Sequence, residues 1–513
     1  MAETGTFPHG ADTIVVGGGT AGAAIAARLA AGSDRNVVLL EAGPDYGPRG
    51  SGRWPMELLD FTGMPVTSHA WGYLSACAHG TPELPLDRAR VIGGCSSHNG
   101  CAAVWGHRDD YDGWAALGNP GWDTDSLLPL FATVNTQLRV FTPTPDEITP
   151  WHRACLDAAP TAGFPVVPNV NDVDLNLGIA IGPINVAEGV RWNTAFAYLD
   201  PVRHLPNLAI RGDTLVDRVI VDRGRATAIE IVGTNGTERI EASEIILCAG
   251  AYGSPLILLR SGIGDPEELR PLGLTTIHSL PGVGRNLQDH TASHVAFAGT
   301  PELVEAMDVF AAAGIPPREE GTIVVAQSSR CRSAFDLHLY PLGRRLPDGG
   351  WHFGIYTAIM TPQSRGTVRL SGRDPEAPPI IDHCYFTDAE DADLEVLADG
   401  IDLARQMAAG QPLSRLAGTE TWPGPALRDR AALHDHLRTT APHDYHPAGS
   451  CKMGPDDDPV AVVDACGRVH GLEGLYVADA SIMPVVPRAN TNLPAAVVGE
   501  KIAAQFLQTA FKR

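Results

Sequence analysis

Four residues near the amino terminus have the types and the spacing needed to bind a dinucleotide. Gly17, Gly19 and Gly22 form a Gly-x-Gly-x-x-Gly run. Glycines at these positions allow a tight turn, the close approach of a pyrophosphate and the close packing of a helix on a sheet. Glu41 follows about 20 residues later, where a carboxylate accepts hydrogen bonds from an adenosine ribose. The pattern therefore predicts binding of FAD or NAD, because an acid at this position suits a free 2′-hydroxyl.

The segments around these residues predict the elements that position them. Residues 13–16 are mostly β-branched and predict a buried parallel strand. Residues 21–31 are rich in Ala and Leu and predict a helix whose amino terminus faces the phosphates. Residues 36–40 predict a second strand that ends at Glu41. This segment alone leaves an NAD-dependent dehydrogenase open as an alternative.

Further glycine-rich and polar motifs occur along the rest of the chain. They are a Gly- and Ser-rich loop at residues 90–100, Gly-Ala-Tyr-Gly-Ser-Pro at residues 250–255, and carboxyl-terminal segments at residues 445–454, 474–484 and 490–494. In this order, from residue 13 to residue 504, the motifs resemble the glucose–methanol–choline family of flavin oxidoreductases. The resemblance favours FAD over NAD, because an NAD enzyme leaves the carboxyl-terminal motifs unexplained.

The resemblance implies an α/β fold in which a discontinuous, Rossmann-like FAD-binding domain carries an α+β substrate domain built on an antiparallel sheet. The expected FAD-binding parts are residues 1–149, 208–291 and 442–513, and the expected substrate parts are residues 150–207 and 292–441. Local patterns agree with a substrate domain of this kind. Residues 336–340 and 367–370 alternate like strands with one buried face, and residues 391–409 have helical spacing.

The resemblance also implies an oxidation of an alcohol carbon by hydride transfer to the flavin N5. By position, His446 accepts the hydroxyl proton, whereas Asn490 orients the substrate oxygen because an amide is not a base. Gly100 and Tyr445 are candidates for the substrate pocket. The residues expected to bind FAD are Gly17, Gly19, Thr20, Ala21, Gly22, Glu41, Ala42, Arg90, Gly94, Ser97, His98, Asn99, Val216, Gly250, Asp479, Ala480, Asn490, Thr491 and Asn492.

His98 is the distinctive residue of the Gly- and Ser-rich loop. Its Ser-Ser-His-Asn setting resembles choline oxidases, in which this histidine is bonded to the 8-methyl carbon of the flavin. We therefore expect covalent FAD tethered through His98. The alternative is a loop histidine that only hydrogen-bonds the cofactor.

The substrate that we expect is not choline. Choline oxidases have Ser where Gly100 stands, and a carboxylate with aromatic neighbours soon after the Asn-Leu-x-Asp-His segment. A cationic ligand needs such an anionic or aromatic cage. Residues 291–301 offer only Phe297 and no acid, although Glu302, Glu305 or Asp308 are possible substitutes. We expect a polar alcohol such as a sugar, an aminosugar or another primary alcohol, with choline as the alternative.

The composition excludes several classes of partner. The chain has 513 residues and a formal net charge of −22, which disfavours nucleic acids and anionic membranes. It shows no signal peptide and no long apolar stretch, and its nine cysteines form no CxxC pair, so we expect a cytoplasmic protein without a metal. The expected partners are a small alcohol and oxygen or another electron acceptor, with the oligomeric state left open.

Two alternative functions of a different class remain open from the sequence. One is a family relative that uses FAD only structurally, as a lyase. The other is a flavin-binding or partner-binding protein without catalysis, against which His446 and Asn490 speak.

Overall fold

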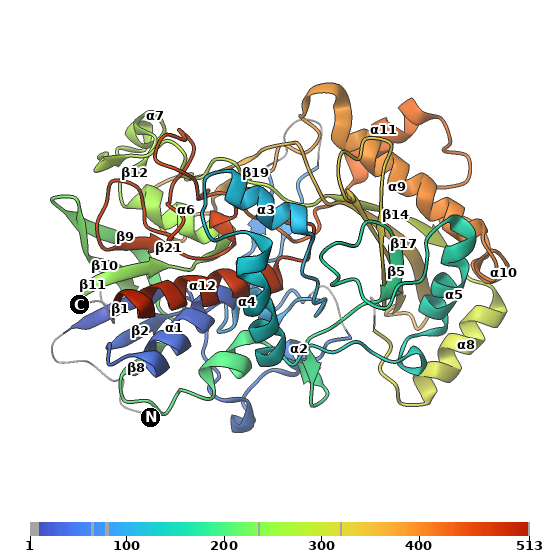
Figure 1. Ribbon diagram of the computed structural model, residues 1–513, viewed down its shortest axis with the longest axis horizontal. Helices are drawn as coiled ribbons and strands as arrows, with labels where there is room; N and C mark the ends of the chain where they lie inside the picture. The colour runs from blue at the N-terminus through green and yellow to red at the C-terminus, as the bar shows by residue number, and fades with distance from the viewer. Residues whose placement is uncertain (1–9, 63–65, 77–81, 234–235, 319–320, 511–513) are drawn as a thin grey trace.

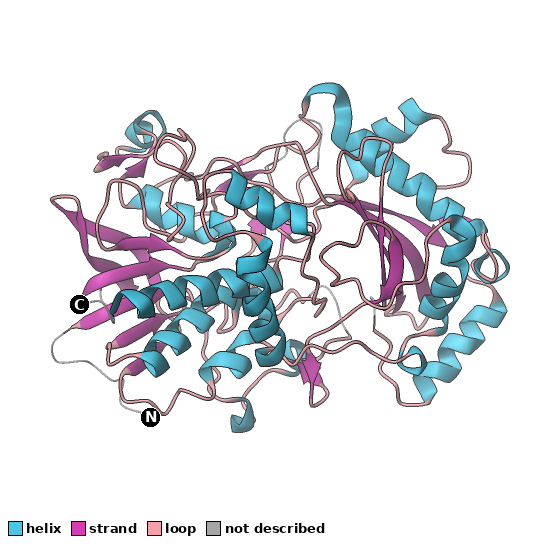
Figure 2. Ribbon diagram, in the orientation of Figure 1, coloured by secondary structure: helices cyan, strands magenta, loops and turns pink. Residues whose placement is uncertain are grey.

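The computed structural model describes residues 10–62, 66–76, 82–233, 236–318 and 321–510. The two large sheets of the described residues lie side by side along the long axis, each with its own set of helices (Figures 1 and 2). The first nine residues, which belong to the segment searched for a signal peptide, lie outside the described part. Within the described residues, no helix combines the length and the hydrophobicity needed to cross a membrane.

The first sheet has seven strands and a parallel centre. Its order is β8 (Leu208–Arg211), β2 (Val37–Leu40), β1 (Ala11–Val16), β11 (Gly236–Leu247), β10 (Arg225–Gly233) and β9 (Leu215–Asp222), with β21 (Leu475–Val477) on the other side of β11. The strands β8, β2, β1, β11 and β21 pair in parallel, whereas β9, β10 and β11 form an antiparallel meander. The predicted strands at 13–16 and 36–40 are thereby confirmed.

Helices cover this sheet and come from distant parts of the sequence. The helix α1 (Thr20–Gly32) packs against α12 (Asn492–Ala510), which in turn contacts α4 (Thr124–Gln137). Alanines on α1 allow the close approach, and Ala23, Ala24 and Ala26 are fully buried. The carboxyl-terminal helix therefore completes the nucleotide-binding unit (Figure 1).

The second sheet is antiparallel and has six strands. Their order is β20 (Glu420–Trp422), β14 (Ala292–Phe297), β17 (Trp351–Ile359), β16 (Leu337–Arg345), β15 (Thr322–Ala326) and β5 (Gly178–Ile181). The helices α5 (Pro150–Ala158), α8 (Pro301–Ala312), α9 (Ala392–Ala409), α10 (Leu413–Leu416) and α11 (Arg430–Thr440) gather on its far side (Figure 1). Apolar side chains of alternate strand residues, such as Leu337, Leu339 and Ile355, join the core beneath these helices. The face of the sheet opposite these helices is available to form a functional site.

Two segments assigned to the substrate domain by sequence pack elsewhere. Residues 192–199, which include the short π-helix η5 (Ala195–Leu199), contribute side chains to the core of the first unit. The predicted strand at 367–370 is present as β18 (Thr367–Arg369), but it pairs with β19 (Ile380–Asp382) outside the six-stranded sheet and contacts α6 (Gly250–Arg260). The alternating pattern of residues 367–370 identifies a buried face of the strand, but it does not identify the sheet to which the strand belongs.

Candidate active site

The turn between β1 and α1 is shaped by contacts that exclude side chains. Gly17 has φ +104°, and a Cβ there would lie 2.4 Å from the Cys248 carbonyl oxygen. A Cβ on Gly22 would lie 2.0 Å from the Gly17 carbonyl oxygen. Gly19 caps the amino terminus of α1, where free N–H groups and the helix dipole favour an anion. The turn therefore has the build of a pyrophosphate site.

Glu41 stands directly after β2, as predicted. Its carboxylate accepts hydrogen bonds from the backbone N–H of Gly18 at 2.9 Å and of Gly43 at 2.9 Å. Burial raises the pKa of Glu41 to about 7, although these two hydrogen bonds lower it. Each carboxylate oxygen keeps further acceptor capacity for a ribose hydroxyl.

A cavity of about 470 Å³ runs from this turn to the open face of the six-stranded sheet. Most of the site residues predicted from sequence line it: Gly17, Gly19, Thr20, Ala21, Glu41, Ala42, Gly94, His98, Asn99, Gly100, Val216, Gly250, Tyr445, His446, Asp479, Ala480, Asn490, Thr491 and Asn492. Gly22, Arg90 and Ser97 are not among the lining residues. The Ser97 hydroxyl donates to the Ile92 carbonyl at 2.9 Å, and Arg90 stacks on Trp71.

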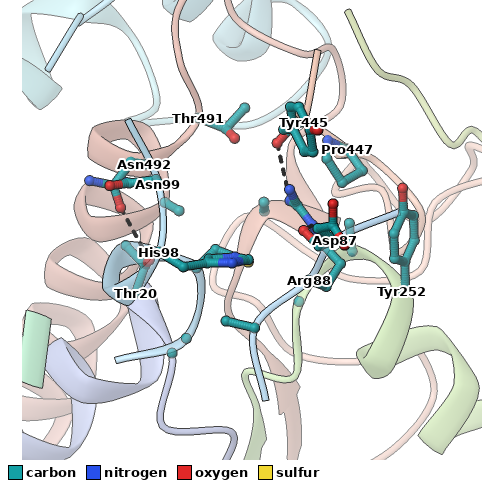
Figure 3. A pocket seen from close by; sticks show the side chains of 18 of the residues that line it. Thr20, Asp87, Arg88, His98, Asn99, Tyr252, Tyr445, Pro447, Thr491 and Asn492 are labelled. Atoms are coloured by element: carbon teal, nitrogen blue, oxygen red, sulfur yellow. Dashed lines mark hydrogen bonds between the residues drawn. The ribbon is translucent and has the colours of Figure 1, made fainter. Parts of the chain in front are cut away.

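The residues present fit FAD. The Oδ1 atom of Asn492 accepts from the Thr20 hydroxyl at 3.2 Å, which joins the amino termini of α12 and α1 (Figure 3). The buried Nδ2 atom of Asn492 has no hydrogen-bond partner within the described chain. Buried polar groups are normally paired, so a donor left over at this place indicates a ligand oxygen. Together with the turn and Glu41, it accounts for the phosphate and ribose parts of the cofactor.

His98 points into the space between the two walls of the cavity, as Figure 3 shows. Its Nδ1 lies 3.2 Å from the Val66 carbonyl oxygen, which as an acceptor requires the proton on Nδ1. The Nε2 lone pair is then available to a ligand. Burial raises the pKa of the neighbouring Cys95 thiol, but the opposing effects, of which the charge of Arg88 is the largest, bring this pKa to about 6.

The structure brings His446 and Asn490 together. The Asn490 Nδ2 atom lies 3.2 Å from His446 Nε2, and because an amide nitrogen is a donor, Nε2 must accept. The His446 proton is therefore on Nδ1, which lies 3.0 Å from His290 Nδ1 and 3.3 Å from an Asp444 oxygen. His446 thus has an unprotonated nitrogen on the cavity side.

A buried carboxylate holds the backbone of His446. Asp289 accepts from the His446 N–H at 2.7 Å and from the Tyr385 hydroxyl at 3.0 Å. His383 lies 3.7 Å from the same carboxylate and bonds to the Tyr252 hydroxyl at 2.9 Å. Burial raises the pKa of Asp289 to about 7, against the lowering effects of His446 and of the Arg88 guanidinium.

Replacing Asp289 by Asn is expected to change how stability depends on pH. In the folded protein Asp289 keeps its proton to about pH 7, whereas in the unfolded chain it loses it near pH 4. The wild type therefore loses stability from this group as pH rises from about 4 to 7, and the variant does not. The difference in unfolding free energy, variant minus wild type, should rise by on the order of a few kcal/mol across this range, measured by urea unfolding at several pH values. A difference that falls with pH would contradict the protonated state of Asp289.

Two residues of the site, Asp289 and His290, were given no role from sequence, whereas His443 was considered as a structural neighbour of His446 and Asp444 was left without a definite role. His290 and Asp289 lie in the Asn-Leu-Gln-Asp-His segment, which was used to mark the return to the substrate domain but was given no chemical role. Asp444 precedes the matched motif and also accepts from the Tyr340 hydroxyl. His443 lines the cavity, with Nε2 2.7 Å from the Pro85 carbonyl oxygen, and burial lowers its pKa to about 4.

The acids considered as substitutes for a choline carboxylate lie away from the cavity. Glu302, Glu305 and Asp308 are on α8 and are not among the lining residues. Glu302 pairs with Arg415 at 3.0 Å. Asp308 accepts from the Trp351 indole at 3.0 Å. Ala292 lines the cavity two residues after His290.

The ligand atoms of His290, Asp444 and His446 lie within 4.8 Å of one another, which is close enough to hold a metal ion. The hydrogen bonds between these groups account for the same spacing. We therefore keep, as a proposal, the prediction from the sequence that this site holds no metal ion.

Comparisons with known proteins agree with this architecture. Two family models described as GMC oxidoreductase match residues 11–292 and residues 362–499. The chain is 34% identical to a choline oxidase from Arthrobacter globiformis, over 96% of this chain and 93% of that protein. It is 32% identical to the human mitochondrial choline dehydrogenase, over 96% and 88%. A pyridoxine 4-oxidase crystal structure from Mesorbium loti matches with a TM-score of 0.87 at 27% identity, over 97% and 99%. The chain therefore belongs to the GMC oxidoreductase family, whose members bind FAD and oxidise CH–OH groups.

Proposed function

We propose that His446 is the base of an alcohol oxidation and that Asn490 orients the alcohol. The observation that carries this proposal is the pair of contacts on His446, which leaves Nε2 unprotonated beside the cavity. A substrate hydroxyl placed between Nε2 and the Asn490 amide would donate its proton to Nε2. Bound FAD would accept the hydride that leaves the carbon bearing this hydroxyl, so that the alcohol becomes a carbonyl.

The neighbours of His446 suit the charge that this step creates. When Nε2 takes the proton, the imidazole becomes cationic while Nδ1 keeps its own proton. Asp444, with one oxygen 3.3 Å from Nδ1, would stabilise the cation. Burial and the charge on His446 hold the pKa of His290 well below its usual value, so the His290 ring stays neutral and accepts from Nδ1.

We also propose that His98 holds the FAD covalently. The Val66 carbonyl fixes the proton on Nδ1 and leaves Nε2 as the nucleophile. The ring points into the cavity (Figure 3). Because the pKa of Cys95 is lowered to about 6, its thiolate form adds negative charge beside the ring near pH 7.

The substrate is proposed to be a polar alcohol other than choline. The wall that follows His290 offers Ala292 and no carboxylate, so a quaternary ammonium lacks an anionic partner there. Choline is the second candidate, because choline oxidases and choline dehydrogenases are among the relatives. We further propose a cytoplasmic location, which the scattered cysteines without a disulfide framework support.

An anaerobic substrate screen tests the proposed function. Purified holoenzyme is mixed with sugars, aminosugars, simple primary alcohols and choline, and the yellow flavin absorbance is followed without air. We expect at least one polar alcohol to bleach the flavin faster than choline does, and admitted oxygen or an added quinone to restore the colour. Bleaching by none of the alcohols would favour the lyase alternative.

A further inference from the structure

His338 of β16 is a buried histidine that takes no part in the proposed proton transfer. Its side chain lines the cavity, although the residue is only 4% exposed. The buried Nε2 atom has no hydrogen-bond partner among the described residues. Because buried polar groups are normally paired, a ring nitrogen left over in a cavity wall indicates a polar atom of a ligand.

The cross-strand neighbours of His338 carry apolar side chains. The register places Val325 of β15 and Ala358 of β17 directly opposite His338. Ala292 of β14 follows Ala358 across the sheet and also lines the cavity. Residues opposite each other share one face of a sheet. These side chains offer the imidazole no hydrogen bond, and the two alanines leave room beside it.

His338 lies close to the reacting end of the site. Tyr340 is two residues further along the same strand and the same face, about 7 Å away between Cα atoms. The Tyr340 hydroxyl donates to Asp444, which has one oxygen 3.3 Å from His446 Nδ1. The charges of Asp444 and His446 both act on the pKa of His338, so the three groups are neighbours. A small ligand that reacts at His446 can therefore also reach His338.

A series of contacts holds the His338 ring in place. The ring of Phe335 stacks on it with 5.3 Å between centroids. The Phe335 carbonyl accepts from Arg488 Nε at 2.6 Å, and Arg488 forms a buried ion pair with Asp110. Arg488 precedes Asn490 by two residues. The same contacts therefore fix His338 of the six-stranded sheet relative to Asn490 of the first unit.

The imidazole of His338 is neutral near pH 7. Burial lowers its pKa to about 3, and the charges of His446 and Arg488 add to this effect while Asp444 opposes it. A neutral imidazole has one N–H donor and one acceptor nitrogen. A hydroxyl suits either role because it can both donate and accept. A quaternary ammonium can do neither and would leave Nε2 unpaired.

We propose that His338 binds a second hydroxyl of the substrate, so that the alcohol oxidised at His446 is a diol or a longer polyol. The inference rests on the proposed function for the reacting hydroxyl and names the substrate class. A site built to bond a hydroxyl rejects the analogue that lacks it, because the buried polar group of the site then stays unpaired. Simple monoalcohols and choline are therefore the poorer ligands.

Pairs of alcohols that differ by one hydroxyl test the second contact. Holoenzyme is titrated anaerobically with straight-chain diols of increasing length, with the monoalcohols of the same length, and with choline. Flavin bleaching gives the Kd and the limiting rate for each compound. We expect the best diol to have a Kd about 5- to 30-fold below that of its monoalcohol, the value of one hydrogen bond.

The variant His338→Phe keeps a ring against Phe335 but removes both ring nitrogens. It should raise the Kd of the best diol by about 5- to 30-fold and leave the Kd of the monoalcohol nearly unchanged. The variant His338→Gln retains a donor and an acceptor, so it should restore part of the preference for the diol. A change in stability alone would not distinguish diol from monoalcohol in this way.

The matched control is His294→Phe. His294 lies in β14 of the same sheet, stacks on Tyr356 at 4.4 Å between ring centroids, and is not among the residues that line the cavity. This variant also replaces a partly buried imidazole by a phenyl ring. We expect it to leave the ratio of the diol and monoalcohol Kd values at the wild-type level.

A diol that resists oxidation separates this inference from the proposed function. Pinacol carries two neighbouring hydroxyls on carbons without hydrogen, and its counterpart is the tertiary alcohol of the same carbon skeleton with one hydroxyl. Their Kd values are measured from changes in the flavin spectrum of the wild type and of the variants. If no alcohol bleaches the flavin but His338→Phe abolishes a preference for pinacol, the hydroxyl site stands and the oxidation fails.

The hydroxyl site is overturned if His338→Phe leaves the ratio of diol to monoalcohol Kd unchanged, or if monoalcohols or choline bind best. An unchanged ratio together with an altered flavin spectrum in ligand-free His338→Phe would likewise overturn it, because His338 would then bind the cofactor.

Discussion

In the variant His446→Gln, the alcohol is expected to reduce the flavin about 10²- to 10⁴-fold more slowly than in the wild type. A positioned base usually contributes a factor of this size to the rate. Glutamine keeps a polar group beside Asn490 but does not take a proton in the same pH range. The measurement is the limiting rate of anaerobic flavin bleaching at saturating alcohol. FAD content should stay at the wild-type level, because His446 is proposed to act on the substrate.

The matched control is His443→Gln, three residues earlier in the same segment. His443 also lines the cavity, but its Nε2 is engaged by the Pro85 carbonyl at 2.7 Å. We expect its limiting rate to fall much less than that of His446→Gln. Equal losses in the two variants would mean that the segment as a whole, and not the His446 base, carries the effect.

The variant His98→Ala is expected to lose covalent flavin completely. Alanine removes the Nε2 nucleophile, while the turn at Gly17 and the acid Glu41 still bind the nucleotide part of FAD. After acid precipitation, the yellow colour should stay with the wild-type pellet and move to the supernatant of the variant. The bleaching rate should fall as well, because the tether no longer fixes the ring against the hydride donor.

His69→Ala serves as the control for the tether. His69 contacts the Tyr46 hydroxyl at 2.6 Å and is not among the residues that line the cavity, so its flavin should remain in the pellet. Release of all flavin from the wild type itself would contradict the tether. In that case His98 would be a hydrogen-bonding group only.

Local patterns were sufficient to predict the nucleotide-binding unit. The strand at 13–16, the glycine turn and the strand at 36–40 are contiguous, and each element is specified by its own residue types. The same holds for α9, which follows the helical spacing of residues 391–409. The strand at 367–370 shows the limit, because a short alternating run identifies a buried face but not its partner strand.

Contacts between distant segments escaped prediction. The hydrogen bond between His290 and His446 joins residues 156 positions apart, and Asp289 holds the His446 backbone across a similar separation. Ser97 stays a predicted cofactor residue, and its hydroxyl donates to the Ile92 carbonyl within its own loop.

Stopped-flow flavin reduction with a deuterated alcohol tests the central claim most directly. The best alcohol from the anaerobic screen is compared with the same alcohol deuterated at the carbinol carbon. The account predicts full bleaching of the flavin with a rate that falls severalfold on deuteration, because the C–H bond breaks as the hydride leaves. A flavin that no alcohol bleaches would contradict oxidation of a CH–OH group by this protein.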